Sequence, residues 1–259
     1  MESKHPITLG TDHHFQTLSG EYSRSRRGYL PKVLSECAEI AKATSLGARP
    51  LILDVGCGTG ISTRSLAALG PKVIGVDPDI SMIREALLAG GSRVAYSCCS
   101  ATAIPWDDQT FDAVVSFGAF HWFASRESVT ELYRLLRPGG SLIIVNKIDK
   151  GELRTVVRAV AGKYGDSIRD PKAKYDPASL LRENRFVHVF TKNINDIEIY
   201  APGELAAHVR TMAPWSRVRP SEQDPAMSEI LTTITRKAPP RLFIERPLRC
   251  RIVIGRKSQ

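Results

Sequence analysis

The chain has 259 residues, of which 42% are hydrophobic and 24% charged, so it is long enough for one large core and too apolar for a largely disordered protein. Its 36 Lys and Arg outnumber its 27 Asp and Glu, which favours an anionic partner, but the basic residues are scattered along the chain, so nucleic acid is not the expected one. Five cysteines without CxxC spacing, and no apolar stretch near the roughly 18 residues that cross a bilayer, predict a cytoplasmic protein without disulfides or a membrane span.

Residues 1–49 are predicted to form an N-terminal helical lid, with helices over 15–42 that are interrupted at 28–31. From Pro50 onward, short runs rich in Val and Ile alternate with helix-compatible stretches, which is the pattern of βαβ units around a parallel sheet. The sequence Arg-Pro-Gly-Gly at 137–140 cannot continue a helix. Residues 50–147 are therefore predicted to be a doubly wound α/β core, with strands over 51–55, 72–76, 93–98, 113–117 and 141–146 and helices over 62–69, 80–89 and 125–136.

The pattern is less regular after Lys147. We interpret residues 148–240 as a substrate-side insertion over the site, followed within 241–259 by a final antiparallel pair of strands, 242–245 with 248–255. The whole chain, 1–259, is then a single domain. Within the insertion, helix-like pieces over 151–165, 177–184, 202–212 and 225–237 surround a strand-like stretch over 187–200.

A glycine-rich loop carries the first chemical signal. Residues 54–60 read Asp-Val-Gly-Cys-Gly-Thr-Gly at the point where the first predicted strand runs into a helix. Glycines there let the backbone turn tightly and approach a ligand closely. A simple turn and a dinucleotide site are the alternatives, but the last glycine of a GxGxxG motif is replaced by Ile61, and Asp54 would repel a pyrophosphate. Asp54 suits the ammonium group of a cationic ligand.

Asp77 carries the second signal, because it ends the second predicted strand. A carboxylate at this position can accept hydrogen bonds from both hydroxyls of a ribose. A loop residue or a helix cap is the alternative reading of a lone Asp. Together with the glycine loop, we assign Asp77 to a ribose.

Four motifs in this order resemble the class I S-adenosylmethionine-dependent methyltransferases, within the small-molecule group that includes ubiquinone/menaquinone-type and trans-aconitate-type enzymes. The motifs are the glycine loop, Val-Asp-Pro at 76–78, Ile-Pro-Trp at 104–106 followed by Thr-Phe-Asp at 110–112, and Leu-Leu-Arg-Pro-Gly-Gly at 135–140. The resemblance implies a Rossmann-like, doubly wound, seven-stranded and mostly parallel sheet whose last strand is antiparallel. It also implies S-adenosyl-L-methionine as cofactor and S-adenosyl-L-homocysteine as product.

The resemblance also implies which residues hold the cofactor. Its methionine portion would lie against Asp54 and the loop glycines, its ribose against Asp77, and its adenine near Ile80. Ser100 departs from the acid that many relatives carry there, so adenine recognition would rest on backbone groups or a hydroxyl. Tyr22, Arg26 and Tyr29 match a family pattern in a segment that closes over the cofactor, although a plain surface helix explains them equally. The full predicted set is Tyr22, Arg26, Asp54, Gly56, Gly58, Gly60, Asp77, Pro78, Ile80, Ala101, Thr102 and Phe117.

Acceptor-side residues are sought after the fourth predicted strand and in the insertion. His121 is the candidate for proton handling because its pKa suits chemistry near neutrality, although His121 and Trp122 are structural residues on the alternative reading. Trp122, Trp215 and Arg217 are candidates for the acceptor pocket, and packing in a loop is their alternative. No histidine has partners at metal-ligand spacing, so a metal site is not expected.

The sequence thus predicts an enzyme that transfers a methyl group to a small-molecule acceptor by direct displacement. A carboxylate or another oxygen or nitrogen nucleophile is the expected acceptor, given the basic net charge. Two alternatives are a related protein that binds the cofactor without methyl transfer, such as a cyclase or a regulatory binder, and a methyltransferase acting on RNA or protein. The chain is expected to be a monomer or a homodimer.

Overall fold

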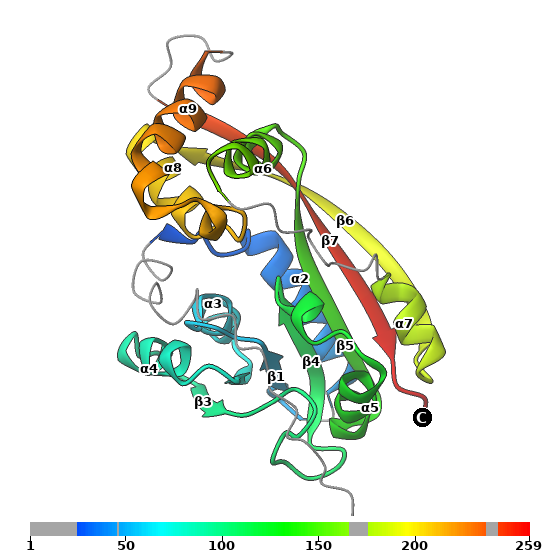
Figure 1. Cartoon of the computed structure of the whole chain (residues 1–259). Helices are drawn as coiled ribbons and strands as arrows, with labels where there is room; N and C mark the ends of the chain where they lie inside the picture. Colours follow the sequence, from blue (N-terminus) through cyan, green and yellow to red (C-terminus); the bar gives the residue numbers. More distant parts are fainter. Residues whose placement is uncertain (1–24, 46, 166–175, 237–242) are drawn as a thin grey trace, which may run out of the picture.

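The computed structural model describes residues 25–45, 47–165, 176–236 and 243–259. These residues form a seven-stranded sheet of order β3-β2-β1-β4-β5-β7-β6 (Figure 1). Strands β1 to β5 are parallel, and β7 runs antiparallel to both of its neighbours. This confirms the predicted doubly wound and mostly parallel sheet. The strands are β1 (Leu51–Val55), β2 (Lys72–Asp77), β3 (Val94–Cys98), β4 (Phe111–Phe117), β5 (Leu136–Asp149), β6 (Val187–Tyr200) and β7 (Ile244–Arg256).

Strand β1 lies at the centre of the crossover topology, where parallel strands are covered on both faces. Its sequence, Leu-Ile-Leu-Asp-Val, has no polar alternation, and every residue after the first is buried. The register pairs Val55 with Val76, so the carboxyl ends of β1 and β2 reach the same edge of the sheet. That edge is where ligands bind in open α/β sheets.

Helices cover both faces of the sheet. Helices α2 (Pro31–Thr44) and α3 (Ile61–Ala67) pack on one face, and α5 (Arg126–Leu135) and α7 (Pro177–Glu183) on the other, while α4 (Ile80–Leu88) contacts β2 and β3. Pro31 occupies the first turn of α2, where its missing N–H costs nothing. The described part of the predicted lid 1–49 is thus mainly α2, which packs on one face of the sheet. Residues 1–24 lie outside the described residues.

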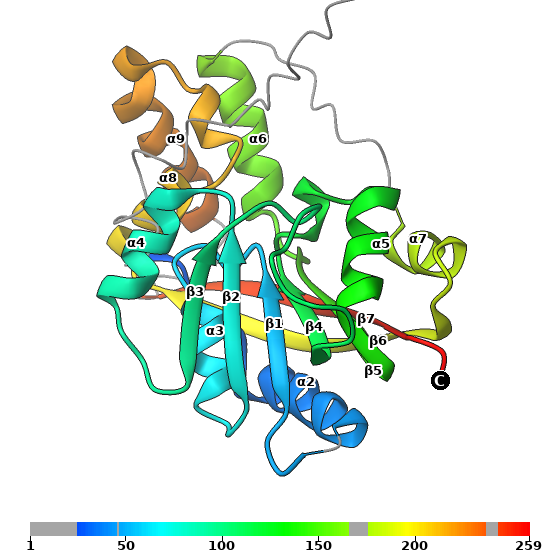
Figure 2. The same ribbon diagram turned by 90° about the horizontal axis from the view of Figure 1, so that it is seen from below.

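Helices α6 (Leu153–Tyr164), α8 (Pro202–Arg210) and α9 (Gln223–Thr235) form a helical cap with its own hydrophobic core. Figure 2 shows this cap beyond the ends of β1, β2 and β3 that carry the arrowheads. The predicted insertion 148–240 is not one continuous unit, because β6 belongs to the sheet and α7 packs on its face. Among the described residues, no helix is long and apolar enough to cross a membrane.

The predicted final pair of strands, 242–245 with 248–255, is wrong. Residues Ile244–Arg256 form a single strand, β7, which lies between β5 and β6. Arg246 and Pro247, which would have to form the turn of such a pair, lie inside β7. Pro247 is tolerated because the pairing with β5 ends at Leu248, and its carbonyl still accepts a hydrogen bond from the Lys150 backbone at 2.9 Å.

Candidate functional site

The glycine loop connects β1 to α3 and is fixed to β2 by backbone hydrogen bonds. The backbone N–H groups of Gly56 and Cys57 donate to the Val76 carbonyl at 2.8 and 3.0 Å. Gly60, at a φ of +74°, caps α3, and a Cβ there would overlap the Tyr96 hydroxyl. At Gly58, with a φ of +54°, no heavy atom of the described residues lies within 4 Å of the position of a Cβ. The loop is therefore packed at Gly56 and Gly60 and open at Gly58.

Asp54 lies beneath this loop and is almost fully buried. The Thr63 hydroxyl donates to its Oδ2 at 2.6 Å, whereas its Oδ1 is buried and has no hydrogen-bond partner among the residues that the structure describes. Burial raises the pKa of the Asp54 carboxyl to about 7, although the Thr63 hydrogen bond acts against this shift. An unsatisfied buried acceptor is costly, so this atom is suited to a donor group from a ligand.

Asp77 ends β2 and accepts two backbone hydrogen bonds. The Gly58 N–H donates to its Oδ2 at 2.9 Å, and the Asp79 N–H donates to its Oδ1 at 3.0 Å. Burial raises the pKa of Asp77, and both hydrogen bonds oppose that shift. Each carboxylate oxygen keeps a second lone pair, so Asp77 can order the glycine loop and still accept from a ligand hydroxyl.

The residues predicted to border an adenine lie at the same edge of the sheet. Cys98 pairs with Asp77, which brings the chain after β3 beside the end of β2. Ile80 opens α4 with 51% of its surface exposed, and Pro78 is also exposed. Ala101 is buried, while Thr102 is exposed and forms a 2.9 Å hydroxyl–hydroxyl contact with Ser100. An apolar surface and a pair of hydroxyls therefore flank Asp77.

The segment after β4 packs on the other side of the glycine loop. A Cβ at Gly56 would be 2.5 Å from the Ala119 Cβ, so the two loops are in close contact. His121 follows in a short 3-10 helix, half-buried, with its ring centroid 4.8 Å from that of Trp122. Trp122 is 51% exposed. Phe117, at the end of β4, lies 5.1 Å from the Tyr29 ring.

Other predicted site residues are placed differently. One guanidinium nitrogen of Arg26 donates to the Thr211 carbonyl at 2.6 Å and so points toward the helical cap. Trp215 is 4% exposed and fills the core of the cap, so it is a packing residue in this structure rather than a pocket wall. Arg217 lies beside it in the same short helix, partly buried. Tyr22 lies outside the described residues.

A buried ionic cluster joins the cap to the sheet, and our sequence analysis missed it. Arg246 forms ion pairs with Asp149 at 2.9 Å and with Glu198 at 3.0 Å, and the Lys147 ammonium contacts Glu198 at 2.5 Å. Burial would raise the pKa of Glu198, but Lys147 and the other partners more than offset it and hold the pKa near 2. Charged residues alternate with Ile in β5 and β6, a pattern that is typical of a solvated face and gave no sign of burial.

His208 belongs to the same cluster and is buried in its neutral form. Burial, together with Arg26 and Arg246, lowers its pKa to about 3. Its Nε2 must accept from Arg246 at 3.0 Å, because a guanidinium only donates. Its Nδ1 therefore carries the proton and donates to the Tyr200 hydroxyl at 3.3 Å, which in turn donates to Glu198 at 2.6 Å.

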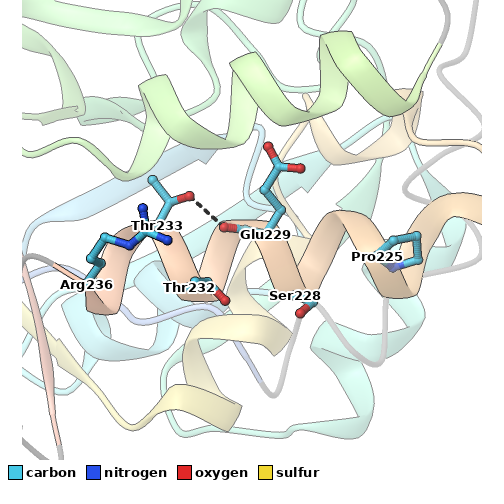
Figure 3. A pocket seen from close by; sticks show the side chains of 6 residues that line it. All are labelled: Pro225, Ser228, Glu229, Thr232, Thr233 and Arg236. Atoms are coloured by element: carbon cyan, nitrogen blue, oxygen red, sulfur yellow. Dashed lines mark hydrogen bonds between the residues drawn. The ribbon is translucent and has the colours of Figure 1, made fainter.

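A separate groove lies on the surface of α9 (Figure 3). Its described lining residues come from this helix and its C-cap, Arg236. Glu229 points from the helix toward α6, where Lys163 and Tyr164 bind its carboxylate. None of the predicted site residues lines it, so we do not place the functional site there. Within the described ranges, no cluster of three or more His, Cys, Asp or Glu could hold a metal ion. The lining residues are Pro225, Ser228, Glu229, Thr232, Thr233 and Arg236.

Comparisons with known proteins identify a methyltransferase domain in this part of the chain. A methyltransferase domain model matches residues 53–144, which include Asp54, Asp77 and His121. An uncharacterized methyltransferase of Mycobacterium tuberculosis is 30% identical over 173 residues, covering 66% of this chain and 68% of the relative. A demethylmenaquinone methyltransferase of Clavibacter sepedonicus is 42% identical over 96 residues, covering 36% of this chain and 39% of that protein.

One solved structure shows how far the likeness of fold extends. Phosphoethanolamine N-methyltransferase 2 of Haemonchus contortus, in complex with S-adenosyl-L-methionine, is similar with a TM-score of 0.56. The sequence identity is 17%, and the match covers 100% of this chain and 63% of that chain. At this identity the likeness is one of fold.

Proposed function

Since this chain belongs to the class I S-adenosylmethionine-dependent methyltransferases, we propose that it transfers a methyl group from S-adenosylmethionine to a small-molecule acceptor. One observation carries the proposal: a buried carboxylate oxygen of Asp54 that lacks a hydrogen-bond partner among the described residues occurs together with open space at Gly58. Both lie at the carboxyl edge of the sheet, where the neighbouring Asp77 carries acceptor groups.

The described residues fit this cofactor. Asp54 would accept from its ammonium group, Gly58 would leave room for its chain, and Asp77 would accept from its ribose hydroxyls. The exposed Ile80 side chain would cover the adenine with apolar surface, beside Thr102. We retain Arg26 only as part of the segment that passes the site, because its guanidinium is engaged by the cap.

Bound S-adenosylmethionine would supply an electrophilic methyl group on its sulfonium sulfur. The protein then has to orient the acceptor, exclude water and accept a proton where the acceptor carries one. His121 is the residue we propose for the proton, because it is half-buried in the segment that contacts the glycine loop. Trp122 offers an exposed ring beside it for an acceptor to pack on.

The acceptor we propose is a small molecule with an oxygen or nitrogen nucleophile, and preferably an anionic one. The net charge of +9 favours anions, and two of the similar proteins are named for small acceptors, demethylmenaquinone and phosphoethanolamine. Arg217 is retained as a candidate anion contact because it is partly exposed in the short 3-10 helix between α8 and α9.

The test is formation of S-adenosylhomocysteine from S-adenosylmethionine with a panel of small carboxylic acids, phenols and amines. We expect turnover with one class, and a His121→Asn variant that binds S-adenosylhomocysteine normally but turns over more slowly, by about 100-fold. Cofactor binding without turnover on any acceptor would favour a regulatory binder, and turnover only on RNA or protein would contradict the small-molecule assignment. An unchanged rate in His121→Asn would remove His121 from the mechanism.

A further inference from the structure

Residues 26–29 run between the glycine loop and the ends of β4 and β5. A Cβ at Gly28 would be 3.4 Å from the Ile61 side chain, which opens α3 directly after the loop. The Tyr29 hydroxyl donates to the Val145 carbonyl at 3.3 Å, and its ring lies against Phe117. Residues 26–29 therefore form a wall beside the proposed cofactor site.

Lys147 holds this wall. Its ammonium donates to the Gly28 carbonyl at 2.7 Å and to the Arg27 carbonyl at 3.1 Å, and it lies 4.9 Å from the centre of the Tyr29 ring. The third donor goes to Glu198 at 2.5 Å. An ammonium has three donors, so all of them are used, and two of them bind backbone atoms of this one segment. Hydrogen bonds from a charged donor are stronger than neutral ones.

The buried cluster fixes Lys147 from behind. Glu198, which binds Lys147, also accepts from Tyr200 at 2.6 Å and from Arg246 at 3.0 Å. Arg27 reinforces the same docking, because its guanidinium lies 4.5 Å from the Tyr200 ring centre and pairs with Glu204 of α8 at 3.0 Å. The position of Lys147 is therefore determined by β6, β7 and the cap together.

We propose that Lys147 is a positioning residue for cofactor binding, which holds residues 26–29 in place beside the glycine loop. The proposal rests on the proposed function. Without Lys147, residues 26–29 would adopt the binding-competent arrangement in only a fraction of the molecules. The apparent affinity for the cofactor would be reduced by that fraction. Lys147 itself acts through the segment and is not assigned a contact with the cofactor.

The chain offers a matched control in Lys257. Its ammonium also donates to two backbone carbonyls, those of Tyr133 at 2.9 Å and Leu136 at 2.8 Å, and it lies 4.7 Å from the Tyr133 ring centre. These contacts lie at the end of α5 and the start of β5, whereas Lys147 lies near the carboxyl end of β5. Lys147→Met and Lys257→Met therefore remove the same kind of interaction at opposite ends of β5.

The measurement is the dissociation constant of S-adenosylhomocysteine by calorimetry, with hydrogen exchange of residues 26–29 in the cofactor-free protein. Lys147→Met should bind about ten-fold more weakly and exchange faster there, because two charge-assisted hydrogen bonds to the segment are lost. Lys257→Met should lower the melting temperature and leave both readouts unchanged. If Lys147→Met does not fold, Lys147→Gln, which can still donate to one carbonyl, should show a smaller change in the same direction.

Equal affinities in wild type and Lys147→Met, or equal losses in both variants, would overturn the proposal, because Lys147 would then act only in stability. Faster exchange at residues 26–29 in Lys147→Met with unchanged affinity would also overturn it. Absence of binding by folded wild-type protein would instead refute the proposed function, and the inference with it.

Discussion

At the residue scale, Asp54 is a buried carboxyl group whose hydrogen bonding is incomplete without a ligand. Its Oδ1 is buried and has no partner within the described ranges, and burial raises the pKa of the Asp54 carboxyl to about 7. A carboxylate in this state favours protonation or a cationic partner. The cofactor's ammonium group would satisfy it, which makes the unliganded protein less stable at this position than the complex.

The raised pKa of Asp54 makes a prediction about pH. Because the pKa is 3.8 in the unfolded chain and about 7 in the folded one, the stability contributed by protonated Asp54 is present below about pH 4 and is lost as pH rises to about 7. In the cofactor-free protein, Asp54→Asn should therefore gain stability relative to wild type between pH 5 and pH 8, by at most about 4 kcal/mol. Urea unfolding of both proteins across this range measures the difference, and a pH-independent difference would contradict the shift.

Asp77 has two proposed roles, contact with the ribose and stabilisation of the local backbone, and a substitution at the neighbouring Asp79 helps to separate them. Asp77→Ala should abolish binding of S-adenosylhomocysteine and also lower stability, because the Gly58 and Asp79 N–H groups lose their acceptor. Asp79→Ala removes the N-cap of α4, where its carboxylate accepts from Ser81 at 2.8 Å, and should cost about 1 kcal/mol without loss of binding.

Calorimetry and thermal unfolding on both variants check this prediction. Retained binding in Asp77→Ala would remove Asp77 from the ribose contact. Equal loss of binding in Asp79→Ala would mean that disorder at the start of α4 is the cause.

Residues at strand ends could be placed from the sequence, but side-chain directions could not. Asp54 and Asp77 lie together because parallel strands end at one edge, a consequence of topology alone. Arg26 and Trp215 were assigned by resemblance and by residue type. The structure directs Arg26 to the Thr211 carbonyl and buries Trp215, and both outcomes depend on how the cap packs, which no local pattern encodes.

At the scale of elements, Gly58 of the glycine loop combines a left-handed backbone conformation with open space around it. Gly58 has a φ of +54°, and no heavy atom in the described part of the chain lies within 4 Å of the place that a Cβ would take, so a methyl group there would meet the proposed ligand rather than these residues. Gly139 provides the matched case near the start of β5, because its φ is +77° and the described residues leave equally open space around it. An alanine at either position therefore has the same unfavourable backbone conformation, but only Gly58 faces the proposed cofactor site.

Gly58→Ala and Gly139→Ala should each lower the free energy of unfolding by about 1 kcal/mol, the cost of a Cβ in the left-handed region. Gly58→Ala alone should weaken S-adenosylhomocysteine binding, by about ten-fold or more, because a close approach of the ligand to the backbone is blocked. Denaturant unfolding and calorimetry give the two quantities. Normal binding by Gly58→Ala would place the ligand elsewhere.

The bounds of the core strands and helices were predicted to within three residues, except that β5 begins five residues earlier than predicted, at Leu136. Buried parallel strands are recognisable because their sequences are continuous apolar runs. The end of the chain was not. Arg246 and Pro247 interrupt the apolar pattern of β7, yet the strand continues through them. In β6 the expected polarity is inverted, since Glu198 is buried while Ile197 and Ile199 are 58% and 49% exposed. Only the partners on β5, β7 and the cap determine that orientation.

At the scale of the whole molecule, the cap and the sheet are joined by Arg246. It contacts Asp149 of β5, Glu198 of β6 and His208 of α8, so one side chain connects three elements. Burying these charges is costly, and the cluster is sustained only while every member is paired. The arrangement links the cap's position to the strand ends that form the site.

Arg246→Met should lower the free energy of unfolding by about 3 kcal/mol or more, because two buried carboxylates lose a partner. Urea unfolding followed by fluorescence and by far-UV circular dichroism measures it. A change below about 1 kcal/mol would show that the cluster is solvated in solution. Arg251 lies on the same strand as Arg246 and forms an exposed ion pair with Asp176, the N-cap of α7. Arg251→Met should change stability by less than about 1 kcal/mol and serves as control.

The most direct test of the central claim is calorimetric titration of the purified protein with S-adenosylmethionine and S-adenosylhomocysteine, with NADH as the contrasting ligand. Our account predicts micromolar binding of the first two and none of the third, because the loop lacks the last glycine of a dinucleotide motif and places a carboxylate beneath it. Binding of NADH, or of none of the three by a folded sample, would contradict the assignment of this edge of the sheet to S-adenosylmethionine.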